Sequence, residues 1–178
     1  MRRYYNETTY SVISFKLYIL PANFNPQSKV WIYQADRIFT MPEIFKIEPY
    51  LENFADSWKS HGAPVKGFAS VLYGQFIIIM ADETATTVGG CSTDSSVHVI
   101  KEIEQMTGVK LFNRELLAFW VKDKVQTIPM AQVGYALENG LLQNDTLYFN
   151  NLVNTKADME ANWLRPIAES WLAKKYIK

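Results

Sequence analysis

Apolar positions along the first half of the chain recur at spacings that predict a strand followed by a helix. Val30-Trp31-Ile32-Tyr33 is a run of β-branched and aromatic residues, which is typical of a strand. Thr40 and Glu43 then form a capping-box pair around Pro42. Apolar residues follow at spacings of three and four, which predicts an amphipathic helix; they are Ile44, Ile47, Leu51, Phe54 and Trp58. The helix is expected to end at Ser60-His61-Gly62-Ala63-Pro64.

The middle of the chain predicts a hairpin, a second helix and a further strand. Two strand candidates, 65–72 and 75–81, are separated by Tyr73-Gly74, which suits a tight turn. A loop over 82–90 leads to a helix over 92–107 that Gly108 ends. Residues 116–121 predict a fourth strand in the core of the domain.

The remaining segments predict an α-β-α extension and an arm at the opposite end of the chain. A helix over 127–138 is expected to stop at Asn139-Gly140, and 146–149 to form a short strand. A last helix opens at Thr155, and Pro166 should kink or split it, because an interior proline costs about 3 kcal/mol. Residues 1–28 form an arm, in which 10–20 could add an edge strand to the domain.

This order predicts one α+β domain over residues 29–178. Its β-α-β-β-α-β core matches a ferredoxin-like fold, with the C-terminal extension covering the sheet. Three strand candidates (30–33, 76–81 and 116–121) are apolar at nearly every position, which indicates that both faces of the sheet are covered. The C-terminal helices, the arm or a partner subunit would supply that cover. A three-layer α/β sandwich is the competing architecture.

Composition excludes several classes of function. The chain balances 18 Lys+Arg against 18 Asp+Glu, which argues against a nucleic-acid binder that works through excess positive charge. A single cysteine allows neither an internal disulfide nor a cysteine-built zinc site, and we expect no metal and no cofactor. The longest apolar run, residues 76–81, is too short to span a bilayer, and no signal peptide is recognisable. A cytoplasmic location is the expectation.

The strongest local signal for a site is the segment Gly89-Gly90-Cys91-Ser92-Thr93-Asp94. Ser92 or Thr93 would cap the following helix, whose free N–H groups and dipole favour a small anionic ligand. The same position lowers the pKa of a cysteine and favours the thiolate. The alternative is a capped helix after a flexible loop, with Cys91 as a small buried apolar residue.

A ferredoxin-like topology would also bring His61 toward Cys91. The loop after the first helix and the loop before the second would lie at one end of the sheet, with Lys122 and Asp123 nearby. A cysteine and a histidine within hydrogen-bond reach are the minimum for nucleophilic catalysis, so Cys91 and His61 are the candidate catalytic pair.

Three other polar segments receive structural interpretations. His98 shares a helical face with Asp94 and Lys101, and an Asp94–His98 surface pair is favoured over half of a metal or acid–base site. The segment Asp36-Arg37 would form an ion pair at a strand end. The asparagine cluster over 150–154 suits turns and helix capping.

From Lys29 onward the chain resembles a bacterial family of short uncharacterised proteins often called "ABC transporter ATPase". The resemblance rests on four blocks: Val30-Trp31-Ile32-Tyr33-Gln34-Ala35-Asp36-Arg37, Gly90-Cys91-Ser92-Thr93-Asp94-Ser95-Ser96-Val97, Phe149-Asn150-Asn151-Leu152-Val153-Asn154-Thr155-Lys156 and Glu169-Ser170-Trp171. ATP hydrolysis of that class needs a phosphate loop ending in Gly-Lys-Ser/Thr, whereas Gly89-Gly90 leads to Cys91. We therefore reject ATP hydrolysis.

The sequence favours a soluble module that binds an unidentified small molecule or protein, with its site over 82–94. A small thiol-dependent enzyme using Cys91 and His61 is the alternative. A structural homo-oligomer is a third interpretation, because aromatic residues make up 14% of the chain. Nucleic-acid and membrane partners are not expected.

Overall fold

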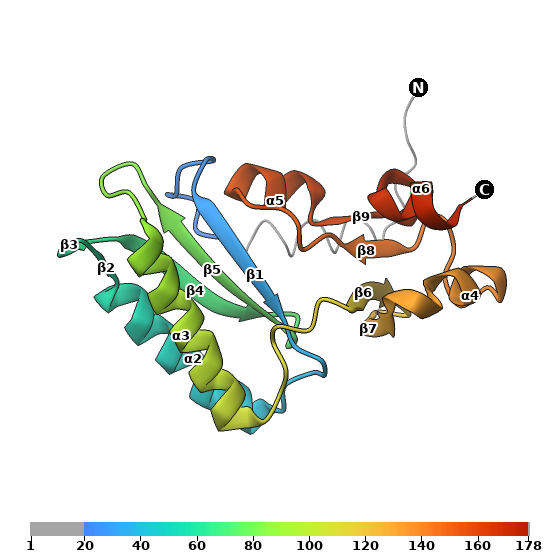
Figure 1. Cartoon of the computed structure of the whole chain (residues 1–178), viewed down its shortest axis with the longest axis horizontal. Helices are drawn as coiled ribbons and strands as arrows, with labels where there is room; N and C mark the ends of the chain where they lie inside the picture. Colours follow the sequence, from blue (N-terminus) through green and yellow to red (C-terminus); the bar gives the residue numbers. More distant parts are fainter. Residues whose placement is uncertain (1–19, 178) are drawn as a thin grey trace.

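The structure contains two antiparallel sheets, the first built by residues 29–82 and the second by residues 116–166, with helices around them (Figure 1). The computed structural model describes residues 20–177, except for the side chains of 91–93. The first sheet has the order β1-β5-β4, with β1 (Lys29–Gln34), β4 (Lys66–Leu72) and β5 (Phe76–Asp82). The second has the order β7-β6-β8-β9, with β6 (Leu116–Val121), β7 (Lys124–Pro129), β8 (Leu147–Phe149) and β9 (Leu164–Pro166). A small hairpin pairs β2 (Lys59–Ser60) with β3 (Ala63–Pro64).

Helices α2 (Met41–Ser57) and α3 (Gly90–Thr107) cover the outer face of the first sheet. The predicted capping box of α2 is confirmed: the Thr40 hydroxyl accepts from the Glu43 N–H, and the Glu43 carboxylate accepts from the Thr40 N–H. The predicted end of α3 is also confirmed, because Gly108 adopts φ 71° and donates to the Glu104 carbonyl. Glycine enters this left-handed region without steric cost.

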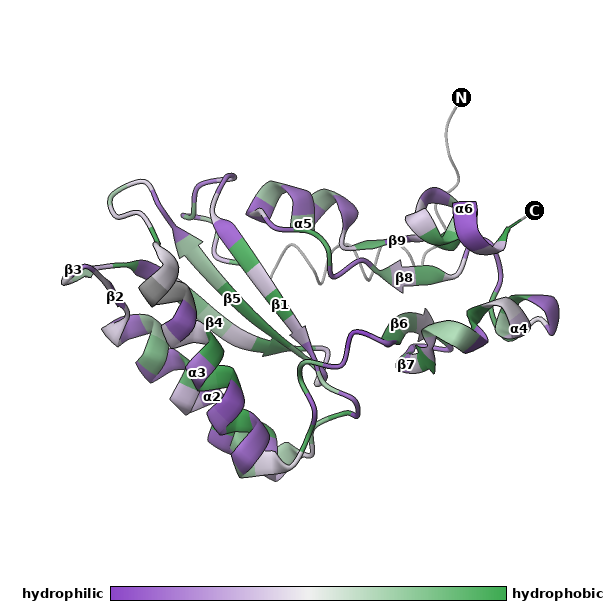
Figure 2. Ribbon diagram, viewed as in Figure 1, coloured by the Kyte–Doolittle hydropathy of each residue, from purple (hydrophilic) through white to green (hydrophobic). Residues whose placement is uncertain are grey.

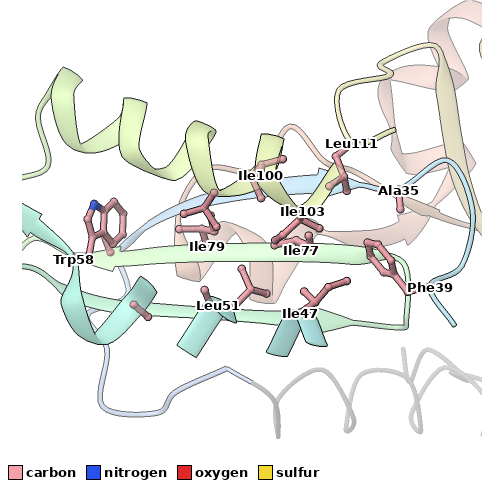
Figure 3. Packing of buried hydrophobic residues seen from close by; sticks show 14 of the residues in the cluster. Ala35, Phe39, Ile47, Leu51, Trp58, Ile77, Ile79, Ile100, Ile103 and Leu111 are labelled. Atoms are coloured by element: carbon pink, nitrogen blue, oxygen red, sulfur yellow. The ribbon is translucent and has the colours of Figure 1, made fainter. Parts of the chain in front are cut away.

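The first hydrophobic core lies between these two helices and the sheet (Figure 3). Ile100 and Ile103 of α3 are fully buried there. Ile47 and Leu51 of α2 are also fully buried, as the spacing of apolar residues in this helix predicts. They pack on alternate residues of β5, including Ile77 and Ile79. Alternation along a strand sends the intervening β5 side chains to the opposite face.

The second core lies on the opposite face of the first sheet, where α5 (Lys156–Asn162), the segment 20–24 and the second sheet contact it. Phe76, Ile78 and Met80 of β5 pack there with Phe149 and Trp163 from the C-terminal half, and all five are fully buried. β5 is consequently hydrophobic along nearly its whole length (Figure 2). The expectation that the first sheet is covered on both faces is confirmed, and the C-terminal half supplies most of the cover.

The third core covers the outer face of the second sheet. Leu117 and Phe119 of β6 face it, together with residues of α4 (Val133–Glu138) and α6 (Trp171–Tyr176). Ala118, between them in sequence, faces the second core. Helices therefore cover the outer face of each sheet, and the protein is α+β in class.

The predicted place of the fourth strand is wrong. The β-α-β-β-α order forms as far as α3, but β6 then pairs with β7 and β8, so the first sheet has three strands among residues 20–177. The edge strand predicted over 10–20 lies, except for Leu20, outside the described residues. The predicted three-layer sandwich does not form either, because a second sheet takes the place of one helical layer. Both edges of β6 are occupied: β7 follows it through the hairpin turn at Lys122 and Asp123, which have φ 50° and 60°, and β8 pairs with its other edge.

Two further predictions at the C-terminal end need correction. The helix expected over 127–138 is strand β7 as far as Pro129, a turn of 3-10 helix η1 (Met130–Gln132) and then α4. Pro166 does split the last helix, as predicted. Its two parts are α5 (Lys156–Asn162) and α6, separated by β9 and the 3-10 turn η2 (Ile167–Glu169).

Candidate functional site

A groove of about 550 Å³ opens between the two sheets, along the outer edge of β1. One wall is β1 itself, from Val30 to Gln34. The segment that connects α3 to β6 supplies a second wall, and the residues after β8 supply a third. Because the expected fourth strand is absent from the first sheet, the edge of β1 is available to line this space.

The backbone of β1 presents polar groups to the groove. The Val30 N–H bonds outward to the Asn154 carbonyl (2.9 Å), whereas the Ala35 N–H bonds inward to Gln75 (2.8 Å). Because alternate residues of a strand bond to opposite sides, the C=O of Val30 and the N–H and C=O of both Ile32 and Gln34 point toward the groove. Within residues 20–177, these five groups bond to no other backbone segment.

A relay of amide side chains forms the floor of the groove. The Trp163 indole N–H donates to Asn151 Oδ1 (3.0 Å), and Asn151 Nδ2 donates to Gln34 Oε1 (2.9 Å). Gln34 Nε2 then donates to the Leu116 carbonyl (3.2 Å). The relay ties the Gln34 end of β1 to the second sheet.

The rim is apolar and carries one charge. Leu152 and Phe112 are 74% and 44% exposed although both are large apolar residues. Arg114 is the only charged side chain among the lining residues, and it forms no ion pair within residues 20–177. Burial raises the pKa values of Tyr33 and Tyr148, so both phenols are neutral at pH 7.

The structure places His61 beside the start of α3. His61 lies in the turn of the β2–β3 hairpin, with φ 51°. Its Nε2 is 3.2 Å from the position that a Cβ on Gly89 would occupy, so the imidazole lies against the residue two positions before Cys91. The side chains of Cys91, Ser92 and Thr93 lie outside the described residues, and their predicted roles stay predictions.

Two details of this predicted site are wrong. Helix α3 begins at Gly90 with Gly89 as its N-cap, rather than at 92 with Ser92 or Thr93 as the cap. Lys122 and Asp123 form the β6–β7 turn of the second sheet. Figure 1 shows that turn on the other side of the molecule from the β2–β3 hairpin, because β6 left the first sheet.

The loop over 82–90 is held by its own carboxylates. Asp82 is buried and accepts from the Thr84 N–H, the Asn25 N–H and Lys66 Nζ, which hold the pKa of its carboxyl well below the usual range. Glu83 accepts from the Val88 N–H (2.6 Å). Two amides of the loop are thus already bound to carboxylates. The prediction of an anionic ligand at Gly89 and Gly90 stays a prediction.

Asp94 and His98 lie in a shallow groove between α2 and α3. His98 Nε2 is 3.4 Å from Glu102 Oε1, so Glu102 takes the place of the predicted partner Asp94. The Tyr50 hydroxyl also donates to Glu102, and burial together with that carboxylate raises the pKa of Tyr50 to about 12. No group of three or more metal-ligating side chains is placed to hold an ion among the described residues.

Sequence reasoning was correct only in part at Asp36-Arg37 and missed the amide relay. Arg37 makes a bidentate ion pair at the strand end, but with Glu43 (2.8 and 2.9 Å), while Asp36 Oδ1 accepts from the Lys110 N–H. Gln34 is a polar residue that ends an apolar strand, and that position was a signal for a buried polar contact. Asn151 was assigned to turns and capping, although its side chain is committed to Gln34 and Trp163.

Comparison with protein-family models, with curated proteins and with solved structures finds no match to this chain. The resemblance to the bacterial family described above stays a prediction. Within residues 20–177, no helix combines the length and the apolar character that crossing a bilayer requires.

Proposed function

We propose that this protein is a binding module that holds its ligand in the groove along β1. The observation that carries the proposal is the set of five backbone polar groups of Val30, Ile32 and Gln34 that face an apolar-rimmed cavity. Polar groups that converge in a largely apolar cavity are typical of a ligand site. The ligand would have an apolar body with amide or carboxylate groups.

The blocks that carry the family resemblance also support this location. Val30–Gln34 of the first block, Asn151–Asn154 of the third and Trp171 of the fourth line the groove. The second block reaches it indirectly, because Ser96 of α3 hydrogen-bonds to the Tyr33 side chain. The sequence features that seemed distinctive along the chain thus gather around one cavity.

A screen of small fragments, followed through the NMR signals of the protein's backbone amides, tests the proposal. The probe is a set of small amides, carboxylic acids and aromatic compounds, observed through the backbone resonances of the full chain. We expect shifts to concentrate on Trp31, Ile32 and Tyr33 of β1 and on Asn151. Shifts confined to another surface, or no shifts at all, would contradict the proposal.

Two exposed leucines provide a matched pair of variants. Leu152 lies on the rim and is 74% exposed, while Leu141 follows α4 and is 62% exposed. Because both side chains are exposed, replacing either should change stability by no more than about 0.5 kcal/mol. Leu152→Ser should weaken fragment binding and Leu141→Ser should leave it unchanged. Equal effects of the two variants would place the site elsewhere.

A second candidate function is thiol chemistry at Cys91 with His61. The contact between His61 and Gly89 favours it, because it brings an imidazole to the start of the helix that carries the cysteine. The rate of alkylation as a function of pH measures the thiol pKa. We expect a value below the ordinary value of about 8.5, and a return toward it in His61→Gln. An ordinary pKa in both proteins would refute this candidate.

We also propose a cytoplasmic protein and retain the homo-oligomer as an alternative. The start of α2 exposes two large apolar residues, Met41 (59%) and Phe45 (70%), one turn apart. Exposed apolar patches often mark contacts between subunits. The mass in solution tests this alternative, since a monomer at high concentration excludes it.

A further inference from the structure

We propose that the ligand of the β1 groove is a short extended peptide with a free carboxyl terminus, bound as an added strand parallel to β1. This inference rests on the proposed function and names the ligand class for the same site. It depends on three features of the groove: the backbone groups of β1, the closed ends of the exposed edge, and the charge of Arg114.

The backbone groups fit an added strand. The outward groups are, in order along β1, the C=O of Val30, the N–H and C=O of Ile32, and the N–H and C=O of Gln34. A parallel peptide satisfies the first four with three residues, because its first and third residues each donate and accept, while the backbone groups of its middle residue point away from β1. An antiparallel peptide would need five residues to reach the same four groups.

The length of the free edge of β1 favours the shorter, parallel peptide. From Val30 to Gln34 the strand advances by about 13 Å, at ~3.3 Å per residue. One end is closed where the Asn154 carbonyl accepts from Val30, and the other where the Gln34 side chain bonds to Leu116. A long peptide would have to leave the groove at both ends of this free edge. A peptide terminus of about three or four residues fits within it.

The walls define the side chains that the peptide should carry. Ile32 faces the second sheet, whereas Trp31 and Tyr33 face the helices of the first sheet. Side chains of paired strands lie on matching faces, so the middle peptide residue would point between the sheets, beside Phe149. Its neighbours would contact Tyr33 and the exposed ring of Phe112, which lie edge to face at 5.7 Å. Apolar residues suit all three positions.

Charge complementarity sets the direction of the peptide. Among the described residues, Arg114 is the only charged one in the lining, and it lies two positions before Leu116, at the Gln34 end of the free edge. A peptide parallel to β1 ends at this same end. Its terminal carboxylate would therefore lie near the guanidinium, which binds carboxylates well.

A library of tetrapeptides with free carboxyl termini, labelled at the amino end, provides the first probe for fluorescence polarisation with the full chain. We expect binders that are apolar in their last three residues. Amidation of the carboxyl terminus should weaken the best binder about fivefold, the size expected for an exposed ion pair. Arg114→Gln should weaken the free acid similarly and leave the amide unchanged, and Arg165→Gln, outside the groove, serves as a control.

Methylation of single peptide nitrogens tests the strand pairing. In the parallel arrangement, the N–H of the last residue donates to Ile32, and the N–H of the preceding residue points away from β1. N-methylation of the last residue should weaken binding by at least about tenfold, whereas N-methylation of the preceding residue should have little effect. The two methylated peptides have equal composition, so each controls for the other.

Several results would overturn this inference. They are the absence of any tetrapeptide binder below 1 mM, equal effects of the two methylations, or tighter binding of amides than of acids. Tightest binding by a synthetic peptide of residues 8–20 of this chain, or self-association that competes with the probe, would instead identify its own arm or a second copy as the occupant. In each of these cases, the proposed function would still stand if small fragments shift the resonances of β1.

Discussion

Replacing Asn151 with alanine tests whether the amide relay fixes the two sheets relative to each other. The variant loses the acceptor of the Trp163 indole N–H and the donor to Gln34 Oε1. Trp163 is 0% exposed, so its N–H would remain buried without a partner. Gln34 faces the groove, where water can replace the lost donor.

The expected loss of stability follows from the surroundings of the Trp163 indole and of the Gln34 side chain. A buried polar group left unsatisfied costs about 1–3 kcal/mol, and a hydrogen bond that water replaces costs about 0.5–1.5 kcal/mol. The sum predicts that Asn151→Ala lowers the free energy of unfolding by about 1.5–4.5 kcal/mol. For a chain of this size, that loss corresponds to a fall in Tm of about 3–18 °C.

Urea denaturation followed by tryptophan fluorescence and circular dichroism measures this cost. Asn154→Ala, in the same loop but with an exposed side chain, is the control and should change stability by no more than about 0.5 kcal/mol. In a double-mutant cycle with Trp163→Phe, the double variant should lose less stability than the sum of the two single variants, by about 1 kcal/mol or more. Additivity within about 0.3 kcal/mol, or a cost for Asn151→Ala equal to the control, would refute the relay.

Two further predictions concern the first sheet and its helices. Hydrogen bonds from Arg37 and Thr40 lower the pKa of Glu43 from 4.5 to about 2, so its contribution to stability is present above pH 4.5 and is lost as pH falls toward 2. The Tm of Glu43→Gln should therefore be lower than that of the native protein at pH 7, and the difference should disappear near pH 2. A difference in Tm that stays constant with pH would contradict this. Gly67→Ala should lower stability by about 1–3 kcal/mol, because its Cβ would lie 3.0 Å from the Ala55 carbonyl oxygen. Gly90→Ala, where a Cβ meets open space, should change stability in urea denaturation by no more than about 0.5 kcal/mol, and equal costs at the two glycines would refute the steric argument.

Local signals in the sequence determined the elements of the first half of the chain. Thr40 and Glu43 satisfy each other within one turn, and Ile47 and Leu51 reach the core from one face of the same helix, so α2 could be recognised without any distant contact. The uninterrupted apolar run of β5 likewise indicated a strand covered on both faces. These features depend on residues within a few positions of one another.

Only the tertiary structure decided where β6 pairs and therefore where the groove lies. The pattern of β6 is apolar and fits either sheet, and its choice depends on the turn at Lys122 and Asp123 and on β8, which follows more than twenty residues later. The relay of Gln34 and Asn151 joins residues 117 positions apart, a pairing that no local spacing encodes. Strand partners and buried polar contacts are chosen by the packing of the whole chain, because a strand leaves its backbone groups to be satisfied by segments that can lie anywhere in the sequence.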